Sequence, residues 1–203
     1  MSIPFHDSET AKNLLRAFAG ESQARNRYNF AANLCQKQEL QAMAFIFQAT
    51  AKQEQAHAKV FWDHLQALNG QNLPIYGAYP IEGTNRILEL LRAAQHNEHE
   101  EHGSVYPSFA AIATQEGFPE AAASFRQIAA IEQLHGERFG LLADQLESGA
   151  LFVSQIETGW MCLNCGHTQN SLEAPKQCPV CNHGQGWFIR LELAPWSPVV
   201  KQT

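Results

Sequence analysis

Five glutamates and two histidines have the types and the spacing needed to bind a pair of metal ions. They are Glu21, Glu54, His57, Glu98, Glu101, Glu132 and His135. Two of the glutamates are each followed three residues later by a histidine, as Glu54-x-x-His57 and Glu132-x-x-His135. Residues three apart lie on one face of a helix, so each pair can direct both ligands towards a shared centre.

These residues interrupt apolar helical faces, where a bundle would place leucine or phenylalanine. Glu132 and His135 continue an apolar stripe at spacings of three and four, which is the pattern of a core-facing helix. The other members of that stripe are Phe125, Ile128, Phe139, Leu142 and Leu146. The equivalent stripe expected further upstream contains Ile87, Leu91, Ala94, Glu98, Glu101, Val105 and Ile112.

Carboxylates in such an interior need compensating positive charge. An isolated buried carboxylate is costly and becomes neutral or paired, and several close together repel one another. Arg25 and Arg126 could reach the edges of the site, but two arginines cannot balance five acids. Di-iron carboxylate bundles use one glutamate from each of two helices and Glu-x-x-His from each of the other two. The sequence therefore predicts a dinuclear metal centre, with Glu101 as an extra acid beside Glu98.

Four segments with helical periodicity must position these ligands. They are residues 8–36, 39–68, 83–116 and 119–148. The 13 residues from Gly70 to Glu82 reach roughly 43–47 Å when extended, and a helix of about 28 residues is about 42 Å long. This connection can therefore just run the length of the bundle, while the other two are short enough to force antiparallel neighbours. The expected fold is an all-α ferritin-like four-helix bundle with a small C-terminal metal-binding β domain.

Four of the five cysteines form two Cys-x-x-Cys pairs. They are Cys162, Cys165, Cys178 and Cys181, with twelve residues between the pairs. Two such pairs give tetrahedral thiolate ligation, which suits either zinc or a single iron. A zinc ion would stabilise the segment and do nothing else, since zinc has no redox chemistry. The segment is too small to form a stable core without a bound metal ion to cross-link it.

Charge and hydropathy exclude several classes of function. The formal net charge of −6 argues against a nucleic-acid partner, which requires a basic face. The N-terminal residues MSIPFHDSET lack the basic and apolar regions of a secretory signal, and no apolar run approaches the length of a membrane helix. We therefore expect a cytoplasmic protein that binds neither nucleic acid nor membrane, in which the cysteine cluster is a metal site rather than disulfides.

Several side chains near the predicted centre have two interpretations. Tyr28 and Tyr106 are core aromatics by default, but each could also donate a hydrogen bond to a metal-binding carboxylate. His102 could pair with Glu98 as an alternative ligand, whereas the rest of the histidine-rich run around it is expected to be solvated or to lie behind the ligands. His64 is expected to be a core or rim histidine rather than a ligand.

The chain resembles the rubrerythrins over nearly its whole length. The matching stretches are GESQARNRY (20–28), KQEQAH (52–57), EHEEHGSVYPSFA (98–110), AIEQLHGERF (130–139) and WMCLNCGH…APKQCPVC (160–181). Their order and spacing match as well, including the gap between the cysteine pairs. The resemblance implies a ferritin-like di-iron bundle over residues 1–149 and a rubredoxin-like domain with one iron in four cysteines over residues 155–203.

The same resemblance implies a non-haem di-iron peroxidase that reduces hydrogen peroxide to water in oxidative-stress defence. Electrons would return one at a time through the cysteine-bound iron. The implied ligands of the oxidised centre are Glu21, Glu54, Glu98, Glu101, Glu132 and His135. His57 would replace Glu101 on one iron when the centre is reduced, and Tyr28 and Tyr106 match family positions near the site. The expected partners are hydrogen peroxide, an unidentified electron-donor protein or reductase, and a second copy of the chain in an antiparallel homodimer.

Two rival functions use the same residues. A ferroxidase or oxygen-reducing bundle would share all the ligands, and the ratio of peroxide and oxygen rates would separate it from a peroxidase. A non-enzymatic, metal-stabilised bundle with a structural zinc ribbon would bind a protein partner, and metal analysis would identify it. Zinc is also an alternative metal for either site in the protein as purified.

Overall fold

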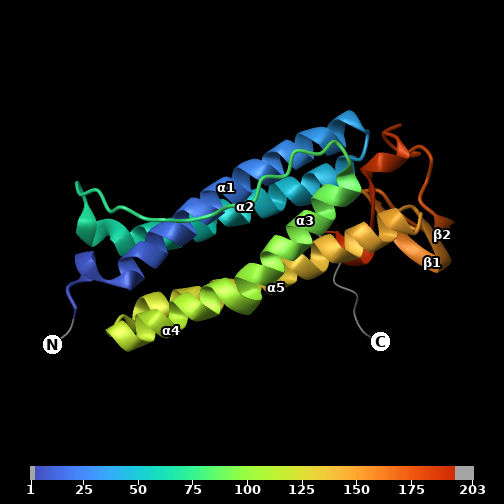
Figure 1. Ribbon diagram of the computed structural model, residues 1–203. Helices are drawn as coiled ribbons and strands as arrows, with labels where there is room; N and C mark the ends of the chain where they lie inside the picture. The colour runs from blue at the N-terminus through green and yellow to red at the C-terminus, as the bar shows by residue number, and fades with distance from the viewer. Residues whose placement is uncertain (1–2, 195–203) are drawn as a thin grey trace.

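The computed structural model describes residues 3–194, which form a bundle of long helices with a small sheet at one end (Figure 1). The helices are α1 Glu9–Lys37, α2 Gln41–His64, α3 Ile87–Glu100, α4 Tyr106–Glu116 and α5 Pro119–Glu147. The π-helical turn Glu101–Val105 joins α3 to α4 without a break, so these three elements form one long helical rod and the structure is a four-helix bundle. The expected bundle with a C-terminal β domain is confirmed. Residues 195–203 of the predicted second domain lie outside the described residues.

Local sequence signals set several of the helix ends. The Ser8 hydroxyl accepts a hydrogen bond from the Ala11 amide and caps the start of α1, as a serine before a helix commonly does. Gly117 adopts φ +86° after α4, where a residue with a Cβ would be strained. Pro119 begins α5, because proline needs no helical N–H partner in the first turn. α2 ends at His64, and a 3-10 turn at Leu65–Leu68 follows it.

The long connection between α2 and α3 crosses the bundle as predicted. Residues 71–86 form neither helix nor strand and run beside α1 towards the start of α3 (Figure 1). Hydrogen bonds to α1 and to Gln38, the residue after it, hold this crossover segment at several points along its length. The Tyr79 hydroxyl donates to the Arg16 carbonyl oxygen at 2.9 Å, and Gln38 Nε2 donates to the Asn85 carbonyl oxygen at 3.2 Å.

The third rod differs from its prediction in two respects. It begins at Ile87 rather than at residue 83, since the Thr84 hydroxyl accepts from the Arg86 amide in a turn before the helix. The π-helical turn then inserts one extra residue into the helical repeat. As a result the buried stripe continues through Tyr106, Ala110 and Ala113, and not through Val105 and Ile112 as expected.

Aromatic layers pack on both sides of the acidic middle of the bundle. On the side nearer the sheet, the rings of Tyr28 and Phe47 lie 5.2 Å and 5.0 Å from the ring of Phe139. On the far side, Phe61 packs at 5.1 Å against Phe125 and at 5.5 Å against Tyr106. The acidic residues therefore lie between two apolar layers that exclude water from them.

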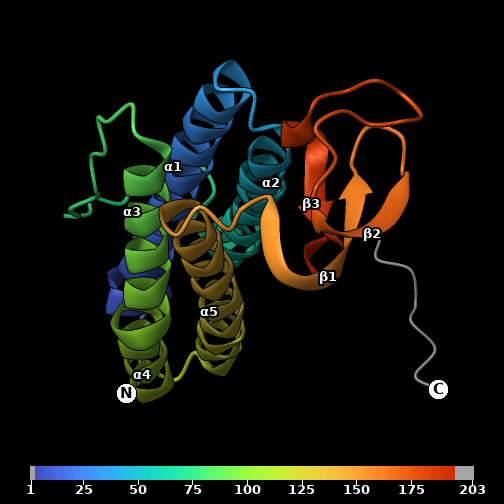
Figure 2. The ribbon, with the colours of Figure 1, turned by 90° about the vertical axis from the view of Figure 1, so that its right-hand side faces the viewer.

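The C-terminal domain is a three-stranded antiparallel sheet in the order β2-β1-β3. Its strands are β1 Val153–Cys162, β2 Thr168–Glu173 and β3 Phe188–Arg190. Trp160, Phe188, Ala174, Cys162 and Cys178 form its own small core. Figure 2 shows this sheet beside the ends of α2 and α5.

The sheet also packs directly on the bundle. Met161, Ile189 and Ala194 belong to the same buried cluster as Met43 and Leu142 of the bundle. The two parts therefore share apolar surface, and the cysteine site is fixed at one end of the bundle. Within residues 3–194, no helix has both the length and the apolar character needed to cross a membrane.

Candidate metal centres

Four helices bring six of the seven predicted ligands of the bundle together. One group contains Glu21, Glu54, His57 and Glu132, and a second contains Glu54, Glu98, Glu132 and His135. The ligand atoms within each group lie within 4.8 Å of one another. Glu54 and Glu132 belong to both groups, so each of these carboxylates is placed to bridge two neighbouring ions.

All six side chains are buried in the middle of the bundle. Their exposed fractions run from 0% for Glu21 and Glu132 to 7% for His57. α1 supplies one ligand, α2 two, α3 one and α5 two. The placement follows the expected pattern of one glutamate from each of two helices and Glu-x-x-His from each of the other two.

Both histidines direct Nδ1 towards the carboxylates. His135 Nδ1 lies 2.8 Å from Glu132 Oε2 and 3.0 Å from Glu54 Oε1. His57 Nδ1 lies 2.8 Å from Glu132 Oε1 and 3.1 Å from Glu54 Oε2. The two rings stack with centroids 5.8 Å apart. The centre is therefore nearly symmetrical about the two shared glutamates.

The hydrogen-bonding state of these atoms fits bound cations. Nine buried side-chain polar atoms among residues 3–194 lack a hydrogen bond of regular geometry, and six of them belong to this centre. The six are Glu21 Oε2, Glu54 Oε1, Glu98 Oε2, Glu132 Oε1, Glu132 Oε2 and His135 Nδ1. Buried polar atoms are otherwise almost always paired, so atoms gathered in this way are suited to ligate metal.

Burial and neighbouring charges shift the pKa values of the glutamates in different directions. Burial, reinforced by the neighbouring glutamates, raises the pKa of Glu21 well above its ordinary value. Burial also raises the pKa of Glu98 to about 8. Burial acts in the same direction on Glu54, but hydrogen bonds from His135 and His57 outweigh it and lower the pKa of Glu54 to about 2.

The histidines respond to the same concentration of negative charge. Burial alone would lower their pKa values, but hydrogen bonds to Glu132 and Glu54 outweigh it. The pKa of His57 rises to about 9 and that of His135 to about 12. The site therefore attracts positive charge, which protons supply in the metal-free protein and which metal ions can supply instead.

Two tyrosines donate to carboxylates on opposite sides of the centre. The Tyr28 hydroxyl donates to Glu98 Oε1, and the Tyr106 hydroxyl donates to Glu21 Oε1. Burial raises the pKa of both phenols well above the ordinary value, so both keep their protons at neutral pH. Both interpretations of these residues hold, because the rings pack in the aromatic layers and the hydroxyls donate to carboxylates.

Glu101 is placed apart from the other six ligands. It is the first residue of the π-helical turn, is partly exposed, and belongs to neither group of clustered ligand atoms. Its side chain lines a cavity of about 240 Å³ beside Tyr106. Burial and the charge of Glu98 raise the pKa of Glu101 well above its ordinary value. Glu101 therefore lies at the edge of the centre, while His57 lies inside it.

The remaining histidines of the bundle lie away from the ligand groups. His102 Nδ1 is 2.8 Å from the Ala129 carbonyl oxygen, so the alternative pairing of His102 with Glu98 does not form. His96 and His99 are exposed. His64 is half-buried and bonds to the Ser124 hydroxyl at 2.9 Å, in agreement with its interpretation as a rim histidine.

Sequence reasoning missed Gln53, which contacts a predicted ligand. Gln53 Oε1 lies 3.0 Å from His135 Nε2, on the side of the ring away from the carboxylates. With a proton on Nε2, this bond leaves Nδ1 free to ligate metal. An exposed glutamine beside Glu54 gives no sequence signal of this role, because the contact spans 82 positions of the chain.

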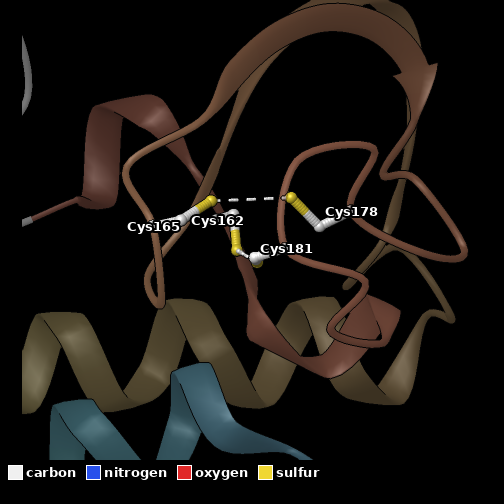
Figure 3. Close-up of side chains that lie close together, drawn as sticks. All are labelled: Cys162, Cys165, Cys178 and Cys181. Atoms are coloured by element: carbon white, nitrogen blue, oxygen red, sulfur yellow. Dashed lines mark hydrogen bonds between the residues drawn. The ribbon is translucent and has the colours of Figure 1, made fainter.

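The second centre consists of the four cysteines, which converge from the end of β1 and from two loops (Figure 3). Cys162 Sγ lies 3.7 Å from Cys181 Sγ, and Cys165 Sγ lies 3.6 Å from Cys178 Sγ. The residue after each second cysteine is left-handed, with φ +76° at Gly166 and φ +61° at Asn182. These two matching turns place the thiols at the corners of one compact site, as tetrahedral ligation requires.

The thiols of this site differ in their surroundings. Cys162 and Cys178 are buried, whereas Cys165 is exposed. A backbone hydrogen bond from His183 lowers the pKa of Cys181 to about 5, which favours its thiolate form. A thiolate is the form that binds metal, so the loop geometry prepares this cysteine for ligation.

Comparison with known proteins agrees with both centres. Residues 12–143 match the family model for rubrerythrin, and residues 160–189 match the model for the rubrerythrin rubredoxin-like domain. The chain is 45% identical to the rubrerythrin of Porphyromonas gingivalis, covering 93% of this chain and 92% of the relative. It is 40% identical to the rubrerythrin of Nitratidesulfovibrio vulgaris, covering 92% of this chain and 96% of the relative.

Solved structures show the same fold. A partially reduced nigerythrin superposes with a TM-score of 0.61 at 24% identity, over 91% of this chain and 90% of the other. The Mycobacterium tuberculosis bacterioferritin BfrA gives 0.61 at 18% identity, over 70% of this chain and 88% of the other. The chain therefore belongs to the rubrerythrin family, with a ferritin-like bundle followed by a rubredoxin-like domain.

Proposed function

We propose that this protein is a peroxidase that reduces hydrogen peroxide to water at the carboxylate centre of the bundle. The observation that carries the proposal is the pair of ligand groups that share Glu54 and Glu132, because two groups with these residues in common could hold two ions near each other. Two ferrous ions bound there would supply the two electrons that cleave one O–O bond. Carboxylate and imidazole ligands suit non-haem iron, and membership of the rubrerythrin family supports the same chemistry.

The side chains of the protein can deliver the two protons that the reaction consumes. Hydrogen peroxide, two electrons and two protons give two molecules of water. Tyr28 and Tyr106 keep their hydroxyl protons at neutral pH and direct them at Glu98 and Glu21. Each tyrosine–glutamate pair can therefore hold a proton beside the reacting oxygens and release it as negative charge develops there.

We further propose that His57 and Glu101 alternate as ligands between the reduced and the oxidised centre. His57 already lies within the ligand group that contains Glu21, while Glu101 lies beside it at the start of the π-helical turn. π-helical turns contain an extra residue and occur frequently at functional sites. The exchange would add a negative charge when the ions are oxidised and remove it when they are reduced.

Electrons would reach the centre from the cysteine site of a second copy. The rubredoxin-like domain meets the bundle near Glu39, and Glu54 follows 15 positions later, which corresponds to about 22 Å along a helix. Gln53 is exposed and bonds directly to His135, so it offers a much shorter route from outside the bundle. Leu134 is 55% exposed on the adjacent helix and provides apolar contact area. We therefore propose an antiparallel homodimer in which the cysteine site of one copy lies near Gln53 of the other, and an external electron-donor protein or reductase supplies the electrons.

The test begins with protein purified without oxygen. Iron and zinc contents and the visible spectrum identify the metals, because thiolate-bound ferric iron absorbs visible light and zinc does not. The reduced protein is then mixed with stoichiometric peroxide and, separately, with oxygen. We expect complete oxidation by peroxide within seconds and slower oxidation by oxygen.

Two variants complete the test. Glu54→Ala removes a shared ligand and should abolish peroxide reduction, whereas Glu137→Ala removes an exposed glutamate from α5 and should leave it intact. Zinc in both sites, or faster turnover with oxygen than with peroxide, would reject the peroxidase proposal. Sedimentation analysis of the full chain tests the homodimer, and a monomer at micromolar concentration would contradict it.

A further inference from the structure

The crossover segment covers one side of the carboxylate centre and is held there by a charged clasp. The clasp consists of Arg27 on α1, Glu82 on the crossover segment and Asn97 on α3. Arg27 Nη1 donates to both carboxylate oxygens of Glu82, at 2.8 Å and 3.0 Å. Asn97 Nδ2 donates to Glu82 Oε1 at 2.8 Å. Glu82 therefore joins two helices that each carry part of the metal centre.

Further bonds orient the arginine of the clasp. Arg27 Nε donates to Gln23 Oε1 at 2.9 Å, and Gln23 Nε2 donates to the Pro80 carbonyl oxygen at 2.7 Å. The side chains of Arg27 and Glu82 are only 15% and 17% exposed, so water screens their attraction weakly. Removal of Glu82 would leave Arg27 without its countercharge in a poorly solvated place. Because residues 71–86 form neither helix nor strand, such side-chain bonds hold the segment in position.

The clasp stands between two cavities that approach the centre from the same side. Arg27 lines both of them. One cavity, of about 250 Å³, is also lined by Tyr28, which bonds to Glu98. The other, of about 240 Å³, is also lined by Glu101 and by Tyr106. The clasp thus lies between the cavity that reaches Tyr28 and the cavity that reaches Tyr106 and Glu101.

The second cavity is the better entrance to the ions. Among the seven predicted ligands, Glu101 alone is partly exposed, and it lies in the wall of this cavity. Pro80 and Tyr79 of the crossover segment line the opposite wall, and the Tyr79 hydroxyl is bonded to α1. A change in how closely the crossover segment is held against α1 and α3 would therefore change the access to Glu101 through this cavity.

We propose that the crossover segment is a size-selective cover on the carboxylate centre and that the Arg27–Glu82–Asn97 clasp holds it closed, so that hydrogen peroxide enters and bulky organic hydroperoxides are excluded. This inference rests on the proposed peroxidase function for its substrate. It assigns Glu82 and Asn97, which ligate nothing, as specificity-determining residues. The cavity itself has room for several water-sized molecules, at about 30 Å³ each, so the proposal places the restriction at the clasp rather than in the cavity.

The test compares the reduction of hydrogen peroxide and of cumene hydroperoxide by the iron-loaded full chain. Glu82→Ala opens the clasp, and Glu82→Gln removes only its charge. Glu147→Ala is the matched control, because Glu147 also pairs with an arginine between two helices but lies on an exposed face, away from both cavities. We expect Glu82→Ala to raise the rate with cumene hydroperoxide, relative to hydrogen peroxide, at least tenfold, with a smaller rise for Glu82→Gln. The control should keep the wild-type ratio.

A second measurement separates this inference from the peroxidase proposal. The reduced, iron-loaded proteins are mixed with a ferrous chelator, and the rate of iron release is followed without any peroxide. An open clasp should speed the release at least fivefold in Glu82→Ala and not in Glu147→Ala. If the wild type reduces no peroxide but Glu82→Ala speeds iron release, the peroxidase proposal fails, whereas the proposal that the crossover segment covers the centre is supported. If iron-release rates and substrate ratios are the same in all variants, the proposal that the crossover segment covers the centre is wrong. Should Glu82→Ala fail to fold, Glu82→Gln carries both measurements.

Discussion

Gly186 of the rubredoxin-like domain lies directly against the backbone carbonyl of Glu39 in the turn between α1 and α2. A Cβ added to Gly186 would overlap that carbonyl oxygen, which no real contact allows. Glu39 itself has φ +61° in a tight turn, so the obstacle is backbone and cannot rotate away. The close approach lets Ile189 and Met161 reach the apolar core of the bundle.

Gly186→Ala should therefore loosen the domain from the bundle without unfolding its cysteine site. Overpacking of this kind costs about 1–3 kcal/mol, which corresponds to a fall in melting temperature of several degrees for a chain of this size. Gly184→Ala is the matched control, because nothing lies within 4 Å of a Cβ at Gly184. Thermal unfolding followed by calorimetry measures both variants. Equal melting temperatures for the two would show that the contact with Glu39 does not hold the domain in place.

The tyrosine–glutamate pairs predict a second set of effects. Tyr106→Phe removes the hydroxyl that donates to Glu21, and Tyr28→Phe removes the one that donates to Glu98. A well-placed proton donor commonly contributes 10²–10⁴-fold in rate, so each change should slow peroxide reduction by roughly 10²-fold with metal content unchanged. Tyr76→Phe is the control, because Tyr76 is 87% exposed on the crossover segment. Stopped-flow oxidation of the reduced proteins would measure the rates, and wild-type rates in both variants would remove the tyrosines from the reaction.

Much of the bundle centre could be predicted from sequence because the signals are local. The Glu-x-x-His spacing places two ligands on one helical face, and the length of the crossover fixes which helices are neighbours. The π-helical turn has no such signal. The sequence therefore places Val105 in the buried stripe, whereas the structure has Tyr106 there. The bond from Gln53 to His135 and the clasp at Glu82 depend on tertiary packing between distant segments, which periodicity cannot show.

Gln53 should affect metal affinity although it binds no metal. Its side chain bonds to His135 Nε2, and loss of a group that orients a histidine ligand typically costs 10–100-fold in metal affinity. Gln53→Ala should therefore weaken binding of ferrous ion by roughly that factor. Gln55→Ala, two residues further along the same helix and also exposed, should bind as the wild type does. Titration of the metal-free proteins with ferrous ion would measure both, and equal affinities would assign Gln53 no part in holding the ligand.

The buried ionisable groups predict how the stability of the metal-free protein depends on pH. The pKa of Glu98 rises from 4.5 to about 8, chiefly through burial. Burial lowers the pKa values of His57 and His135, but hydrogen bonds to glutamates outweigh it and raise them from 6.5 to about 9 and about 12. A group with a raised pKa binds its proton more tightly in the folded state, so its contribution to stability is complete below the unfolded pKa and is lost as pH rises through the folded pKa. Glu54 acts in the opposite direction, but its contribution is lost only as pH falls from 4.5 towards 2.

Between pH 6.5 and 8, Glu98, His57 and His135 therefore all act in one direction, and the free energy of unfolding of the metal-free protein should fall as pH rises. One proton bound more in the folded state than in the unfolded state gives a slope of about 1.4 kcal/mol per pH unit, and we expect at least that slope. Urea unfolding at several pH values in this range measures it. Glu98→Gln removes one titrating group and should make the slope shallower. A stability that stayed constant or rose with pH would show that the metal-free centre does not retain its protons, and the charge balance described for it would be wrong.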